Sequence, residues 1–302
     1  MPLSHKNIAM ILYTIAVVCN VFEIILMKHL GVSYDLSVES LIFSRTIFEC
    51  IIILPVVFYK KIFSEFLLCN QKRNILIAGI LLTCESFLWN SGVRNVSIND
   101  AFNVSFLIPI MVTLMSILFL KEKVSKKEIL LIFFCIIISV IYVNYQYKLT
   151  VNSDIKSYIY LILATIFSSF GLILKKKISF TVSPIVVVSC NVLIFFIIFS
   201  GVNIVSVNGV LNSFNFKGNL FMIVNSVLHL IEIYLVIKAY SMINIATLQP
   251  LRFNKFLFSA TLGYFYFKES LTVVQLIFFV LIAAANLCNS YKFQNKKLEK
   301  YI

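Results

Sequence analysis

Charged residues are scarce in this 302-residue sequence. They make up 13% of the chain, against about a quarter in ordinary soluble domains, while hydrophobic residues make up 60%. Apolar runs of about 18 residues or more are typical of transmembrane helices, because about 20 residues at 1.5 Å each cross the hydrocarbon layer of a bilayer. The low charge therefore excludes a soluble globular domain and predicts a polytopic membrane protein.

Motifs for nucleotide binding, metal binding and nucleophilic catalysis are also lacking. No G-x-x-x-x-G-K-[ST] loop occurs, which argues against ATP-driven transport by this chain alone. The seven cysteines are scattered without a C-x-x-C pair, and the chain has only three histidines. We therefore expect no catalytic residues, no metal and no cofactor.

Ten apolar runs are long enough to span a membrane, and short connections join them. Polar residues interrupt the third, fourth and ninth. The runs lie at 8–27, 41–59, 75–92, 98–120, 129–147, 158–174, 185–205, 219–240, 246–267 and 271–290. The sequence thus predicts an all-α protein with ten transmembrane helices.

The net charge of +13 has an uneven distribution along the chain. If the N-terminus is cytoplasmic, 17 Lys and Arg residues fall in inner segments and six in outer ones. The positive-inside rule then places both termini in the cytoplasm, with the chain in the cell (inner) membrane. We interpret the basic excess as a sign of membrane topology. We therefore expect the chain to contact the lipid bilayer and not nucleic acid.

An internal repeat is visible in the spacing of charged residues. A shift of 147 residues places three of them on residues of like charge: Lys28 on Lys175, Glu85 on Glu232 and Glu122 on Glu269. Each match falls at the same place in a unit of five helices, which indicates a duplication. Because five is odd, the second unit is inverted, and inverted repeats are typical of transporters with a substrate site between the halves.

Several segments resemble the EamA family of the drug/metabolite transporter superfamily. They are "MKHLGVSYDLSVESLIFSR", "SGVRNVSINDAFNVSFLIP", "LFLKEKVS", "LKKKISFTVSP" and "PLRFNKFLFSATLGYFYFKES". The resemblance implies two five-helix EamA repeats, at 8–147 and 158–291, and secondary transport. Some similar proteins with the proline-arginine-aromatic ninth helix import S-adenosylmethionine, and others export amino acids or drugs.

Charged residues inside the predicted spans are the candidate site. Each costs about 2.5–3.5 kcal/mol at the bilayer centre on insertion scales, so most must face a polar cavity or one another. Arg45 and Glu49 are four residues apart and can form an internal ion pair, or Arg45 can face the cavity and bind an anion. Arg252 suits a carboxylate or phosphate because its planar fork binds such groups with two hydrogen bonds. Lys255 is expected to point elsewhere.

Two further groups have alternative interpretations. His229 and Glu232 share one helix face, and they can act as a titratable gate or only as a structural hydrogen bond. Glu85 shares a face with Trp89, which suits an organic cation, but Trp89 also fits an interfacial aromatic belt. The candidate residues for substrate binding or coupling are Glu23, Arg45, Glu85, Trp89, His229, Glu232 and Arg252.

The charges of both signs favour an amphoteric solute as the small-molecule substrate. We therefore expect a secondary transporter of a small polar metabolite, an amino acid or a derivative such as S-adenosylmethionine, working by alternating access. The alternatives are an intramembrane lipid-modifying enzyme, and a passive channel or accessory membrane subunit.

The fifth and tenth spans carry no charge and can meet lipid or a second copy of the chain, which allows a homodimer. Glu122 and Glu269 are expected to cap the helices that follow them and to pair with Lys121 or Lys268.

Overall fold

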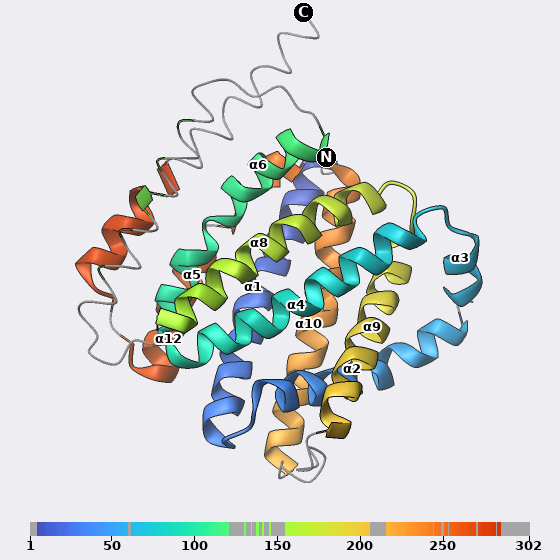
Figure 1. The fold of residues 1–302 in the computed structure, drawn as a ribbon, viewed down its shortest axis with the longest axis horizontal. Helices are drawn as coiled ribbons and strands as arrows, with labels where there is room; N and C mark the ends of the chain where they lie inside the picture. Colours follow the sequence, from blue (N-terminus) through green and yellow to red (C-terminus); the bar gives the residue numbers. More distant parts are fainter. Residues whose placement is uncertain are drawn as a thin grey trace, which may run out of the picture.

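The computed structural model describes most of the chain, and its regular elements in that part are helices (Figure 1). The described residues are 5–59, 62–120, 155–205, 216–243, 245–248, 251–252, 254–269, 271–281 and 283–284, with single positions between 130 and 145. Within them, six helices are long and apolar enough to cross a membrane. They are α1 (His5–Ser33), α2 (Val38–Tyr59), α4 (Lys72–Asn95), α8 (Ile155–Ile178), α9 (Pro184–Val205) and α10 (Phe216–Met242). The chain is an all-helical, multi-pass membrane protein.

The predicted spans 98–120 and 246–267 are not continuous helices, which corrects the sequence prediction. The first is divided into α5 (Ile98–Ser105) and α6 (Ile108–Leu120), and the second into α11 (Ile245–Leu248) and α12 (Asn254–Phe267). Pro109 explains the first break, because a proline has no N–H and its ring clashes with the carbonyl group four residues earlier. The predicted span 129–147 lies almost wholly outside the described residues, as does the end of 271–290.

Helices from the two parts of the chain pack against each other more extensively than among themselves. Helix α1 lies along α10, and α4 lies along α8, as Figure 1 shows; α2 also packs against α9. Gly92 makes the approach of α4 to α8 possible, because a Cβ there would lie 2.9 Å from the carbonyl oxygen of Ser157. Small residues at such contacts let transmembrane helices pack closely.

The outer surface of the bundle is apolar, as a lipid-facing surface requires. Phe58 on α2 and Ile197 on α9 are 74% and 66% exposed. The interior contains apolar clusters as well, and one of them joins α1, α4, α5 and α8 through Ile24, Trp89 and Ala164. Polar side chains are therefore concentrated between these clusters, inside the bundle.

Candidate substrate cavity

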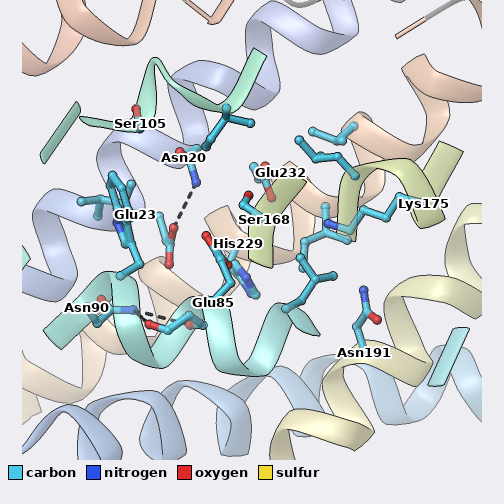
Figure 2. Close-up of a pocket in the computed structure, with 18 of the residues that line it drawn as sticks. Asn20, Glu23, Glu85, Asn90, Ser105, Ser168, Lys175, Asn191, His229 and Glu232 are labelled. Atoms are coloured by element: carbon cyan, nitrogen blue, oxygen red, sulfur yellow. Dashed lines mark hydrogen bonds between the residues drawn. The ribbon is translucent and has the colours of Figure 1, made fainter. Parts of the chain in front are cut away.

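A polar cavity of about 110 Å³ lies inside the helix bundle (Figure 2). Its walls come from α1, α2, α4, α8, α9 and α10, and from the places where α5 gives way to α6 and α11 to α12. Sites for drug-sized ligands occupy roughly 300–1,000 Å³, so the size of this cavity suits a small solute. Both parts of the chain therefore contribute to one central site.

All seven candidate residues line this cavity: Glu23, Arg45, Glu85, Trp89, His229, Glu232 and Arg252. They come from α1, α2, α4 and α10 and from the stretch between α11 and α12. The placement agrees with the argument that charges within apolar spans face a polar interior. Their roles in binding or coupling stay predictions.

Arg45 sits in a buried network of ion pairs. Its Nη1 lies 2.5 Å from Glu23 Oε1 on α1, and its Nε lies 3.2 Å from Glu49 Oε1 on α2. Its Nη2 donates to the hydroxyl of Ser86 on α4 at 3.2 Å. All three charged side chains are nearly inaccessible to solvent. The predicted local pair with Glu49 is present, and Glu23 extends it across the helices.

His229 extends the same network from α10. Its Nδ1 lies 2.7 Å from Glu49 Oε1, so α10 is linked to α2 through this carboxylate. Glu49 is fully buried behind the cavity wall, whereas His229 lines the cavity and keeps 13% of its side chain exposed. An imidazole that contacts both the cavity and a buried carboxylate has the geometry to take up or release a proton there.

Glu85 and Glu232 differ from the carboxylates of this network. Both line the cavity and are partly buried, from near the middle of α4 and of α10. In the described part of the chain, neither lies within 4.0 Å of a basic nitrogen. These are the two glutamates that the 147-residue spacing pairs, and the fold brings both to one cavity.

Basic side chains form another part of the wall. Arg252 Nε donates to the hydroxyl of Tyr13 at 2.8 Å, and Lys255 Nζ donates to Asn20 Oδ1 at 2.5 Å. Lys255 lines the cavity, so the expectation that it points elsewhere was wrong. The helix break explains the error, because Arg252 precedes α12 and the two residues do not share one continuous helical phase.

Trp89 does not lie in an interfacial belt. Its side chain is 7% exposed, packs against Phe102 with ring centroids 6.1 Å apart, and lines the cavity. Its indole Nε1 is buried and has no hydrogen-bond partner among the described residues, although a buried indole N–H usually finds an acceptor.

The connections near the helix ends differ from expectation at Glu269. Its Oε1 lies 3.2 Å from Lys28 Nζ, and its Oε2 accepts the backbone N–H of Ile98 at 2.8 Å. Glu269 thus caps α5 and pairs with α1, rather than pairing with Lys268. The corresponding prediction for Glu122 falls outside the described residues.

Two cavity residues escaped the sequence argument. Lys175 on α8 is 6% exposed and Asn191 on α9 is 1% exposed, and both line the cavity. From the sequence, Lys175 was used only as the repeat partner of Lys28 and was not placed in the site. In the structure Lys176, rather than Lys175, makes the contact that corresponds to that of Lys28: Lys28 Nζ donates to the carbonyl of Val96, and Lys176 Nζ donates to that of Ile243.

The described residues contain no group of three or more His, Cys, Asp or Glu side chains arranged to hold a metal ion. The groups that this site offers to a ligand are therefore charged and hydrogen-bonding side chains. The cavity contains separate anionic and cationic residues, together with amides and hydroxyls from Asn20, Asn90, Ser105 and Ser168. Such a set can hold a small molecule that carries both kinds of charge.

Comparisons with known proteins give the fold, and a family to which the first part of the chain is similar. Among solved structures, 28 chains match. One of them, titled only "Crystal structure of protein", matches with a TM-score of 0.60 and 12% sequence identity, covering 94% of this chain and 98% of its own. At that identity the likeness shows the fold alone. No curated protein matches the sequence. The sequence profile of the EamA-like transporter family matches residues 7–145. That match covers a little under half of the chain, so the first part of the chain is similar to EamA-like transporters.

Proposed function

We propose that the protein is a secondary carrier that moves a small, polar, amphoteric metabolite across the membrane by alternating access. An amino acid or an amino-acid derivative fits this description. The observation that carries the proposal is the cavity, which is lined by unpaired charges of both signs from both parts of the chain. A metabolite with a carboxylate and an ammonium group complements such a lining, and few other small solutes do.

Each charge has a role in this proposal. Arg252 binds the anionic group, because its Nε is held by Tyr13 and its planar fork matches a carboxylate. Glu85 and Glu232 face the cationic group or carry a proton when the site is empty. Trp89 supports the cation with its ring face, in the manner of cation–π contacts.

The arrangement of helices supports two inverted halves, 8–147 and 158–291. The first helix of each half packs on the third of the other, α1 on α10 and α8 on α4. The fourth helix of each half is discontinuous, beginning at Ile98 in one and at Ile245 in the other. Discontinuous helices around a midplane site are common in carriers that rock one repeat against the other. In this proposal the chain lies in the cell (inner) membrane with both termini cytoplasmic.

A competition uptake assay tests the proposal. Cells that express the chain are given a labelled amino-acid mixture, with unlabelled amino acids, nucleosides or S-adenosylmethionine as competitors. We expect saturable flux that an amphoteric compound inhibits and that Arg252→Ala abolishes. Lys177→Gln, a change on the exposed side of α8, is the matched control and should transport normally. Flux without saturation or competition would instead indicate a passive channel and contradict the proposal.

A further inference from the structure

Cations outnumber carboxylates among the unpaired charges of the cavity. Lys175, Arg252 and Lys255 all line it, and no carboxylate oxygen in the described part of the chain lies within 4.0 Å of their nitrogens. Only two unpaired carboxylates, Glu85 and Glu232, line the same space. These five groups together carry one net positive charge when all are ionised.

The Arg45 network does not supply the missing negative charge to this wall. Glu23 and Glu49 both lie within 3.2 Å of the Arg45 guanidinium, and Glu49 is also bonded to His229. Glu49 is fully buried behind the wall, and its Oε1 contacts both Arg45 and His229. When ionised, Arg45, Glu23 and Glu49 carry one net negative charge, and it stays with α1 and α2, where these groups contact one another. The surplus positive charge therefore belongs to the side of the cavity formed by α8, α9 and α12.

Lys175 and Asn191 are the residues through which a ligand could bind to this positively charged side of the cavity. The structure gives Lys175 no hydrogen-bond partner among the described residues, although its side chain is only 6% exposed. Both amide atoms of Asn191 are buried without a partner. Figure 2 shows the two residues at one end of the cavity, with Asn20 and Glu23 at the other. Buried polar groups are normally satisfied, so an ammonium and an amide at the same end of the cavity, neither with a partner among the described residues, indicate a place for an acceptor.

We propose that the substrate carries a second anionic group, a carboxylate or a phosphate, which binds Lys175 and the Nδ2 of Asn191. This inference rests on the proposed function and makes the substrate class narrower. Arg252 binds the first anionic group, and Glu85 and Glu232 face the ammonium. An amphoteric metabolite with one ammonium and two carboxylates carries net charge −1, which balances the five unpaired groups of the wall. A phosphate in place of the second carboxylate carries about −1.5 to −2 by itself and makes the net charge more negative.

The test uses the purified full-length protein and ligand pairs whose members differ in charge. Thermal unfolding is recorded with increasing L-glutamate or L-glutamine, and with O-phospho-L-serine or L-serine. We expect the anionic member of one pair to reach half-maximal stabilisation at a concentration about tenfold lower, as a charge-assisted hydrogen bond allows. The pair that shows the larger difference distinguishes a carboxylate from a phosphate.

Two variants show whether Lys175 and Asn191 cause the preference. Lys175→Gln removes the ammonium, and Asn191→Asp places a carboxylate beside it, so each should abolish the difference between the members of a pair. Lys177→Gln, two residues along the same helix and exposed, should keep it. If Lys175→Gln fails to fold, Asn191→Asp still gives the measurement.

Equal or better stabilisation by the neutral members would overturn the inference, as would stronger stabilisation by S-adenosylmethionine, whose net charge is positive. Either result leaves the proposed carrier of amphoteric metabolites intact. If no amphoteric compound stabilises the protein or competes for uptake, the proposed function fails as well.

Discussion

Two groups of buried charges lie beside each other in this protein, and they are organised in opposite ways. In one group, Arg45 is bonded to Glu23 and Glu49, and His229 completes the network. In the other, Lys175 and Glu232 face the cavity without an ion-pair partner among the described residues. The first group satisfies its own charges and joins three helices. The second leaves its charges available to a ligand.

The comparison separates two uses of charge inside a membrane protein. A buried pair is costly to break, because removing one partner leaves the other charge without compensation. A charge that lines an aqueous cavity keeps part of its hydration, so its removal changes what the cavity binds more than how the helices pack. Pairing therefore predicts structural importance, and the lack of pairing predicts a role in substrate recognition.

Replacing Arg45 should have the largest effect. Arg45→Met removes the guanidinium from the buried Glu23 and Glu49, and loss of one partner of a buried ion pair costs about 3–5 kcal/mol in comparable cases. We expect little monodisperse protein by size-exclusion chromatography and a melting temperature lowered by several degrees. The same substitution in the other group, Arg252→Met, should leave both close to wild type. Equal loss of stability in the two variants would contradict the division into two groups.

Changes at Arg252 should affect transport strongly and stability little. Arg252→Lys keeps the charge but loses the two-pronged fork, so uptake affinity should fall by about tenfold. Arg252→Ala should abolish uptake while membrane abundance stays normal. The measurement is uptake as a function of substrate concentration, normalised to the amount of protein in the membrane. Wild-type transport by Arg252→Ala would show that this residue does not contact the substrate.

Glu85→Gln and Glu232→Gln keep the shape of each side chain and remove its charge. If these carboxylates carry a proton or face the cation, each variant should lose transport, or lose the pH dependence of transport, at normal abundance. Uptake kinetics measured from about pH 5.5 to 8 make the test. Unchanged profiles in both variants would mean that the two glutamates only form hydrogen bonds within the bundle.

The cavity residues that the sequence revealed were the charged ones. Because an ion in hydrocarbon is so unfavourable, Glu85 or Arg252 inside an apolar run already indicates a polar interior. The 147-residue spacing that matches Glu85 with Glu232 further predicted that both belong to one site. The helical fold was predicted from the apolar runs, because runs of this length are typical of transmembrane helices.

What the sequence did not reveal depends on geometry at the level of single residues. Asn191 is uncharged, so its presence in an apolar run carries little cost and gave no signal. Lys175 was hidden among three lysines, and only the structure shows that Lys176 takes the carbonyl contact that corresponds to Lys28. Lys255 was misplaced because the break before α12 changes the helical phase, which hydropathy does not report.

The ion pair between Lys28 and Glu269 offers the mildest test of the comparison. It is a paired contact at the edge of the bundle, with side chains 9% and 16% exposed, and Glu269 also caps α5 through the N–H of Ile98. Glu269→Gln keeps an acceptor for that N–H and should be nearly neutral. Glu269→Ala removes the cap as well and should cost about 0.5–2 kcal/mol, the usual range for such caps. Thermal unfolding measures both, with Lys268→Gln at the exposed neighbouring position as the control.

Because this pair satisfies its own charge, neither variant should change which compounds compete for uptake. An altered substrate preference would show that paired charges also take part in recognition.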